Sequence, residues 1–271
     1  MGKSNFGKLL GVGAGIALGA YLMREYMKRK QTYDGSFSPL IDSVKVVTDG
    51  VLTNLWTFRW DDEEHCKRAT EEKLNSRGEV TMKTSLVFDF QEYQIVIRKY
   101  INDESVPSET TYLSLNDFDV VTSIVTHSKE GGEQSWQLDI NGAELSQIMS
   151  EEETAKMYWH DGNLEGISYF EEVRQKMTYY KDKENYIFPD INLFANGFSL
   201  DMLTTYLVGV RSRYFLRTMS ITGANYHQQS QLSYLLDNFD RPIQVLVEQT
   251  EVSDTITTNS SKEFEIKYKR I

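Results

Sequence analysis

Residues 136–167 read WQLDINGAELSQIMSEEETAKMYWHDGNLEGI, and the architecture of the chain can be inferred from this stretch. Apolar and polar side chains alternate before Asn141-Gly142, and Met157 and Trp159 repeat that spacing before Asp161-Gly162. Asn-Gly and Asp-Gly between alternating runs are strong signals of a hairpin turn. Alternation gives a strand one buried face and one solvated face. The stretch therefore predicts successive antiparallel hairpins.

The same pattern recurs on both sides of this stretch. Gln94–Ile101 (QIVIRKYI) reads as a strand, and Asn116-Asp117 and Asp237-Asn238 stand at further predicted turns. A repeat of this length corresponds to one hairpin. The predicted fold class is therefore mainly β: an antiparallel meander of hairpin repeats with one short helix, preceded by an N-terminal hydrophobic helix.

Two segments depart from the strand pattern. Residues 193–209 (LFANGFSLDMLTTYLVG) show helical spacing after Ser199, which can cap a helix, and Gly209 is a plausible helix end. The segment from Ser253 to Lys262 is rich in Ser and Thr, and it is predicted as a hairpin loop.

An uncharged run occupies residues 9–23 near the N-terminus and is flanked by basic residues. Glycines four apart share one helix face, where they permit close packing of helices in lipid. These glycines are Gly7, Gly11, Gly15 and Gly19. The predicted organisation is a glycine-zipper-like membrane helix with a basic flank at 1–31, a linker at 32–42 and a β-rich domain at 43–271. The membrane is the expected partner, and the glycine stripe suits a homo-oligomeric contact.

Two alternatives remain open for this N-terminal run. Its basic start, apolar middle and Ala17-Leu18-Gly19 also fit a cleaved signal peptide. A soluble glycine-rich tail is the other alternative, because the run is shorter than the ~20 residues of an ordinary spanning helix.

The bulk composition excludes several function classes. The net charge of −11 opposes binding to a nucleic-acid backbone, which needs basic patches. Cys66 is the single cysteine, so neither an intramolecular disulfide nor a cysteine-based zinc site can form.

No catalytic motif stands out in the sequence, and no catalytic, metal or cofactor residue is assigned. His65 beside Cys66 follows four acidic residues, but the spacing matches no standard metal site. Trp56 and Trp60 share one face of a predicted strand. They could stack on a ligand if exposed, although burial in the sheet is the commoner fate of large aromatic residues.

Three stretches resemble one protein family: Phe188–Leu193 (FPDINL), Leu207–Leu216 (LVGVRSRYFL) and Leu232–Val245 (LSYLLDNFDRPIQV). They are similar to segments of a family of unknown function found mainly among Bacteroidetes cell-envelope proteins. Asp240-Arg241-Pro242 stands where that family has Gly-Arg-Pro. The resemblance implies a β-rich, non-enzymatic envelope protein. Its members usually carry a lipoprotein signal, whose cysteine is missing near this N-terminus.

The leading hypothesis is a membrane-anchored β-rich envelope protein that acts as a non-catalytic scaffold or binding module for a protein or a glycan. The alternative is a hydrolase acting on carbohydrate or peptide on a β scaffold. An outer-membrane barrel is disfavoured, because Arg59, Arg98 and Lys99 put charge on both faces of strands.

Overall fold

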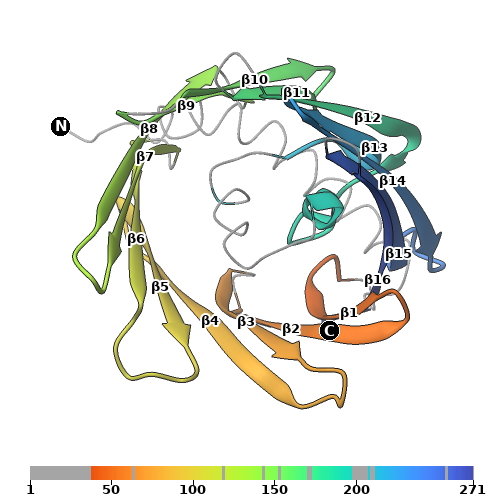
Figure 1. Ribbon diagram of the computed structural model, residues 1–271. Helices are drawn as coiled ribbons and strands as arrows, with labels where there is room; N and C mark the ends of the chain where they lie inside the picture. The colour runs from red at the N-terminus through yellow and green to blue at the C-terminus, as the bar shows by residue number, and fades with distance from the viewer. Residues whose placement is uncertain are drawn as a thin grey trace.

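The computed structural model describes residues 38–62, 65–117, 120–141, 144–151, 154–169, 173–196, 207, 211–253 and 256–270. Within these ranges the chain forms one closed antiparallel barrel, in which each strand pairs with the next and β1 pairs with β16 (Figure 1). The strands are β1 (Ile41–Thr48), β2 (Val51–Trp60), β3 (Cys66–Leu74), β4 (Val80–Phe90), β5 (Gln94–Ile101), β6 (Glu109–Leu115), β7 (Val121–Ser128), β8 (Glu133–Asn141), β9 (Glu144–Met149), β10 (Thr154–His160), β11 (Asn163–Tyr169), β12 (Val173–Glu184), β13 (Tyr214–Thr222), β14 (Tyr226–Leu236), β15 (Pro242–Ser253) and β16 (Ile256–Tyr268).

The predicted antiparallel meander is confirmed. β10 and β11 pair directly across Asp161-Gly162, and both turn residues have positive φ, 49° and 72°. Two successive left-handed residues match the twist of a hairpin, and an Asp-Gly pair supplies them at low cost. β8 and β9 likewise pair across the predicted turn at 141–142, although Gly142 lies outside the described residues.

The sequence disfavoured an outer-membrane barrel, and the structure shows that the strands do close into a barrel. Ser43 to Thr48 of β1 pair with β16, so the meander closes on itself and leaves no free sheet edge. Charge on both faces does not prevent closure. Arg59 and Arg98 lie on the outer face, whereas Lys99 lies on the inner face and forms a 3.0 Å ion pair with Glu109.

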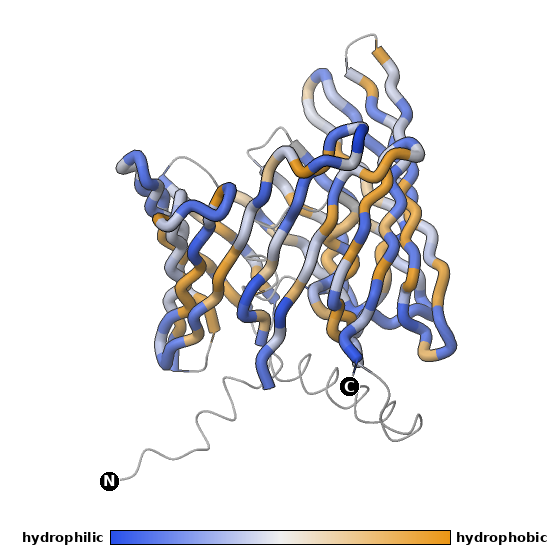
Figure 2. Tube along the Cα trace, turned by 90° about the horizontal axis from the view of Figure 1, so that it is seen from below, coloured by the Kyte–Doolittle hydropathy of each residue, from blue (hydrophilic) through white to orange (hydrophobic). Residues whose placement is uncertain are grey.

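The outer face of the wall carries many polar side chains, and its inner face is apolar toward the end where β1 begins and β16 ends. Directly paired residues share a face, so the register assigns each residue to one side. One inner row runs through Phe58, Ala69 and Leu86, all buried. Figure 2 shows the alternation as blue and orange along the strands. Examples of the outer face are Lys45, Arg59, Arg68, Asp89, Arg98, Gln137, Lys156, Lys176, Gln229, Glu248, Glu265 and Lys267.

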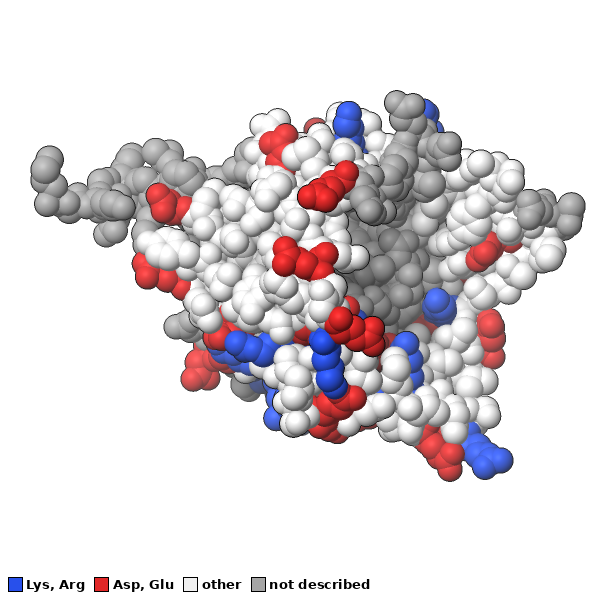
Figure 3. All heavy atoms as spheres, turned by 60° about the vertical axis from the view of Figure 1, so that its left-hand side comes forward, with Lys and Arg blue, Asp and Glu red and all other residues white. Residues whose placement is uncertain are grey.

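Charged side chains of both signs lie on the outer surface, as one side of the barrel shows in Figure 3. Some of them pair across neighbouring strands: Lys45 lies 3.8 Å from Glu265, and Arg98 lies 3.8 Å from Asp89. The outer face of the described strands therefore carries charged side chains together with exposed apolar ones such as Leu52 and Leu235.

Of the two irregular segments, one lies largely outside the described residues and the other differs from expectation. A 3₁₀ helix, η1 (Ile191–Asn196), precedes the predicted helix, most of which lies outside the described residues. The predicted loop at 253–262 is mostly strand, because β16 begins at Ile256 and continues the pairing with β15. Its Ser and Thr side chains occupy a long hairpin that extends the sheet.

The N-terminal helix predicted at 1–31 lies outside the described residues. No segment of the described ranges forms a helix with the length and hydrophobicity that a bilayer crossing requires.

Candidate functional site: the barrel interior and its plug

The connection between β12 and β13 enters the barrel. We call residues 185–196 and 211–213 the plug, and Figure 1 shows its helix η1 inside the ring of strands. Backbone bonds fix it to the chain that leads into β1. The Ile41 N–H donates to Phe188 O at 2.8 Å, and the Phe188 N–H donates to Pro39 O at 3.0 Å. The plug therefore sits at the end of the barrel where β1 begins and β16 ends, which we call the plug end.

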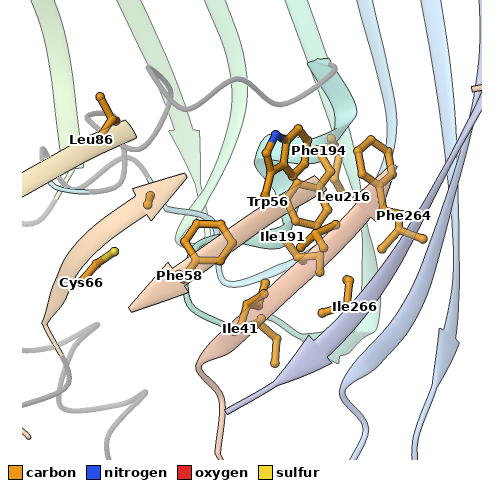
Figure 4. Close-up of a cluster of buried hydrophobic side chains, with 14 of the residues drawn as sticks. Ile41, Trp56, Phe58, Cys66, Leu86, Ile191, Phe194, Leu216, Phe264 and Ile266 are labelled. Atoms are coloured by element: carbon orange, nitrogen blue, oxygen red, sulfur yellow. The ribbon is translucent and has the colours of Figure 1, made fainter. Parts of the chain in front are cut away.

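An aromatic cluster joins the plug to the wall. Phe194 stacks on Phe264 with ring centroids 4.9 Å apart, and Trp56 lies 5.9 Å from Phe194 (Figure 4). All three side chains are buried, with Trp56 2% exposed. Burying such large side chains makes this cluster a major contributor to stability.

Buried polar side chains within the plug, centred on Asp190, hydrogen-bond to one another and to the plug backbone. Asp190 Oδ1 accepts hydrogen bonds from the Asn185 side chain and, at 2.9 Å, from the Asn192 N–H. Arg211 donates to Ile187 O at 3.0 Å and lies over the Phe188 ring at 4.2 Å. Asp190 is 3% exposed and Arg211 is 5% exposed. Such a group stabilises the fold only while its partners are all present.

The environment of Asp190 sets its protonation. Burial raises the pKa of the Asp190 carboxyl above its ordinary value, and the Arg211 charge and hydrogen bonds from Asn192 and Asn185 oppose that rise. The burial effect is the larger, because removing a carboxylate from water costs more than these partners return.

Two plug side chains connect it to the adjacent strands. Asn192 donates to Tyr214 O at 2.9 Å and accepts from the Leu216 N–H at 2.7 Å, which extends the backbone pairing of β13. Ser212 accepts from the Leu164 N–H at 3.0 Å and donates to the Tyr179 hydroxyl at 2.8 Å. The plug is thus bonded to β11, β12 and β13.

A second arginine, Arg241, contacts both strands of the pair that closes the barrel, at the start of β1 and the end of β16. Arg241 forms an ion pair with Asp237 at 2.8 Å and donates to Ser38 O at 2.8 Å. Its guanidinium also lies 4.4 Å from the centroid of the Tyr268 ring. Arg241 therefore connects the turn before β15 to the start of β1 and the end of β16.

The inner wall is apolar around the plug end. A set of inward side chains there, which we call the apolar ring, is between 0% and 5% exposed. Its members are Ile41, Phe58, Ala69, Leu86, Ile97, Leu113, Val121, Leu145, Leu216, Leu232, Val245 and Phe264. Side chains that line a water-filled channel would instead be exposed to solvent.

The inner wall is mainly polar toward the opposite end, which we call the mouth. On β5, Lys99 follows Ile97 on the same face, and on β6 Thr111 lies two residues from Leu113. Thr111 bonds across to Thr126 at 2.9 Å. Other inward residues near the mouth are Thr84, Glu109, Gln134, Gln228, Ser230, Gln249 and Lys262. The interior therefore changes from apolar to polar along β5 and β6, whereas β10 and β11 turn Ala155 and Tyr169 inward near the mouth.

The structure places the two tryptophans singled out in the sequence at the plug end. Trp56 is in the buried cluster, and half-buried Trp60 donates to Ile41 O at 2.8 Å. The Trp56 ring is therefore closed to a ligand, whereas Trp60 keeps part of its surface exposed. Gly7, Gly11, Gly15 and Gly19 lie outside the described residues.

His65 and Cys66, which are adjacent in the sequence, lie in different environments. Exposed His65 lies 3.6 Å from Asp61, whereas the adjacent Cys66 points into the core, where burial raises the pKa of its thiol to about 12. A thiol with that pKa is a poor nucleophile. Exposed His160 and Asp161 are 3.4 Å apart at the β10–β11 turn.

The described residues contain no group of three or more His, Cys, Asp or Glu side chains placed to hold a metal ion. Asp190 faces Asn185 and Arg211 rather than a second carboxyl group. Asp190 is therefore not paired with a second carboxyl group in the manner that glycoside hydrolases use.

Sequence reasoning did not assign a role to the plug residues, although the family resemblance pointed at them. Asp190, Asn192, Arg211, Ser212 and Arg241 all lie in the three stretches quoted for that resemblance. A usable signal was Asp190, a charge between the apolar residues Pro189 and Ile191. The roles of the plug residues depend on contacts between distant parts of the chain.

Comparison with known proteins shows the fold. The chain is similar to a porin-like protein from Bacteroides uniformis with a TM-score of 0.64 and 12% identity, covering 86% of this chain and 98% of that one. A porin-like protein from Bacteroides vulgatus matches with a TM-score of 0.53 and 11% identity, covering 86% and 99%. No protein-family model and no curated protein matches the chain.

Proposed function

We propose that this protein is a non-catalytic binding scaffold of the bacterial envelope, whose barrel stands in water and does not conduct solutes. The barrel likeness to porin-like proteins supports an envelope setting. The observation that carries the proposal is the sidedness of the wall. A transmembrane barrel turns an apolar band about 25 Å tall toward lipid and a polar face inward, whereas this wall turns charged side chains outward and an apolar ring inward at the plug end.

The outer face supports the aqueous placement. Lys or Arg on the lipid face of a barrel costs about 2–4 kcal/mol at the bilayer midplane. Residues such as Arg59, Arg68 and Lys156 are exposed on the outside of their strands. Several such charges on one wall would oppose insertion by more than its scattered apolar residues could offset.

The inner face supports a closed lumen. Sixteen- to eighteen-stranded porins leave an aqueous channel, whose lining is polar. Here the apolar ring is buried and the plug is bonded to the wall through Asn192 and Ser212. A path for water or ions through the plug end would have to wet these side chains.

Liposome swelling with the full-length chain tests this function. Liposomes reconstituted with the protein should shrink in a sugar solution and stay shrunken, like protein-free liposomes, while a general porin in parallel restores their volume. A swelling rate that rises with the dose of protein would identify a diffusion pore and contradict the proposal.

We further propose that residues 1–31 tether the barrel to a membrane, with the stripe of Gly7, Gly11, Gly15 and Gly19 as a contact between copies. The full-length chain should stay in the membrane pellet after carbonate extraction, and Gly11→Leu with Gly15→Leu should abolish cross-linking between copies without releasing the protein. A chain that starts after Gly19 would identify a cleaved signal peptide, and release of the intact chain would identify a soluble tail.

A further inference from the structure

A groove of about 1840 Å³ lies over β10, β11 and β12. Most of its lining comes from the outer faces of these strands, as with Lys156, Tyr158 and Ser168, and the inward-facing Met177, which packs against the core, also borders it. The groove therefore lies mainly on the outer side of the wall and opens to solvent.

One row across the groove carries two cations. Lys156 pairs with Ser168, and Ser168 pairs with Arg174, so the three side chains stand side by side on the outer face. Both cations are exposed. Because the Ser168 side chain between them is short, the surface is hollowed between the two longer side chains.

The next row carries an exposed aromatic ring and a third cation. Tyr158 pairs with Gly166, and Gly166 pairs with Lys176. A Cβ on Gly166 would lie 3.6 Å from the Tyr158 ring, so the ring lies across the bare glycine. The Tyr158 hydroxyl is 3.3 Å from Ser168 Oγ, and the residue is 55% exposed. The ring is thus held over the sheet with a large part of its surface in solvent.

The charge of the groove is opposite to that of the chain. Two acidic residues, Asp161 and Glu165, also line it. The lining cations are Lys156, Arg174, Lys176, Lys181 and Arg213. Arg213 lies 3.6 Å from Glu184, whereas the other four cations form no ion pair with any described residue. In a protein of net charge −11, this local excess of positive charge attracts anions.

We propose that this groove binds an acidic polysaccharide. The open Tyr158 ring offers a platform for the apolar face of a sugar, and the cations on either side can pair with carboxylate or sulfate groups. Seven residues of strand along β10 or β12 span ~23 Å, which suits a chain of sugars better than a single headgroup. The concave form of the groove likewise suits a strand-like ligand rather than a flat lipid surface.

Affinity electrophoresis and calorimetry of the full-length protein with polygalacturonate test the proposal, with dextran as the neutral polysaccharide. The protein should bind polygalacturonate and not dextran, and 0.5 M salt should weaken binding, because the contacts are exposed charges. The variant Lys156→Glu with Lys176→Glu should lose at least tenfold in affinity. Its matched control, Arg68→Glu with Lys267→Glu, makes the same charge change on the outer wall away from the groove and should bind normally.

Variants at Tyr158 distinguish the contribution of ring stacking from that of the charged side chains. Tyr158→Ala should lose several-fold in affinity, whereas Tyr158→Phe keeps the ring and should bind like the unchanged protein. Equal losses in the groove variant and its control would show non-specific attraction and overturn the proposal. So would absence of binding to both polygalacturonate and chondroitin sulfate, or groove-dependent binding to phosphatidylglycerol vesicles alone.

The inference rests on the proposed function in one respect, namely that the outer wall stands in water. The two fail in different assays. Swelling of liposomes would contradict the non-conducting barrel, whereas loss of specificity between the two charge variants would contradict only the glycan site.

Discussion

The plug end and the mouth are built from the same strands but differ in what their inner faces do. At the plug end the inward residues are buried and apolar, and the plug is packed and bonded against them. Two residues further along, Lys99 and Thr111 have replaced Ile97 and Leu113. The difference shows that the hydrophobic core occupies one end of the barrel only, and stability should be concentrated there.

Thiol reactivity should show the largest contrast between the two ends. Cys66 at the plug end has a pKa of about 12 against an ordinary value of 9.0, so the folded protein should react with a thiol reagent about a thousandfold more slowly than an exposed cysteine. Gln134→Cys, made together with Cys66→Ala, places the thiol at the exposed mouth and should react at once. Comparable rates for the two proteins in native buffer would mean that the plug end is open to solvent.

Removing a charged side chain from the plug should lower the free energy of unfolding far more than removing one at the mouth. Arg211→Met leaves Asp190 without its cation and should lower the free energy of unfolding by about 3–5 kcal/mol. Lys99→Met breaks the half-exposed pair with Glu109 and should cost about 0–1 kcal/mol. Chemical denaturation measures both. Similar losses would show that the plug is not an integral part of the core.

Two substitutions on β6 compare the stability contributed by the plug end and by the mouth within one strand. Leu113→Ala should cost about 2–5 kcal/mol, because a fully buried side chain leaves a cavity. Thr111→Ala, two residues away on the same face of β6, removes one hydrogen bond to Thr126 and should cost about 0.5–1.5 kcal/mol. If the Thr111 variant were the less stable one, the core would have been assigned to the wrong end.

The buried carboxyl group of Asp190 should have the smallest effect of these on stability, and that effect should depend on pH. The folded protein holds the Asp190 proton more tightly than the unfolded chain does, because burial raises its pKa. Its contribution to stability is therefore present below the ordinary pKa of 3.8 and declines, by up to about 1.4 kcal/mol per pH unit, as the pH rises toward the raised value. Asp190→Asn should remove this part of the pH dependence in denaturation curves. An unchanged slope in that variant would assign the dependence to other groups.

The hairpins could be predicted from sequence because their determinants are local. Asp161-Gly162 and the alternation on either side fix β10, β11 and their turn together. The Ser- and Thr-rich start of β16 was predicted as a loop, since polar residues pair in a long hairpin without an apolar face to mark them.

Closure and the plug could not be predicted in the same way. Alternation does not reveal whether β1 meets β16, whose pairing joins Val44 to Ile266. The plug lacks a regular period, and its anchors Asp190 and Arg211 acquire meaning only when the chain folds back into the barrel. The charges on both strand faces were read as evidence against an outer-membrane barrel, and such charges do not bear on whether the sheet closes.

The most direct test of the account is the accessibility of the outer wall in the membrane-bound, full-length protein. Single cysteines at Gln137, Gln229 and Glu265, each in a Cys66→Ala background, would be labelled with a membrane-impermeant maleimide after opening any enclosing membrane. The account predicts rapid labelling at all three positions, because the wall stands in water. A belt of unlabelled outer positions about 25 Å tall, with labelled positions above and below it, would mean that lipid surrounds the barrel and would contradict the account.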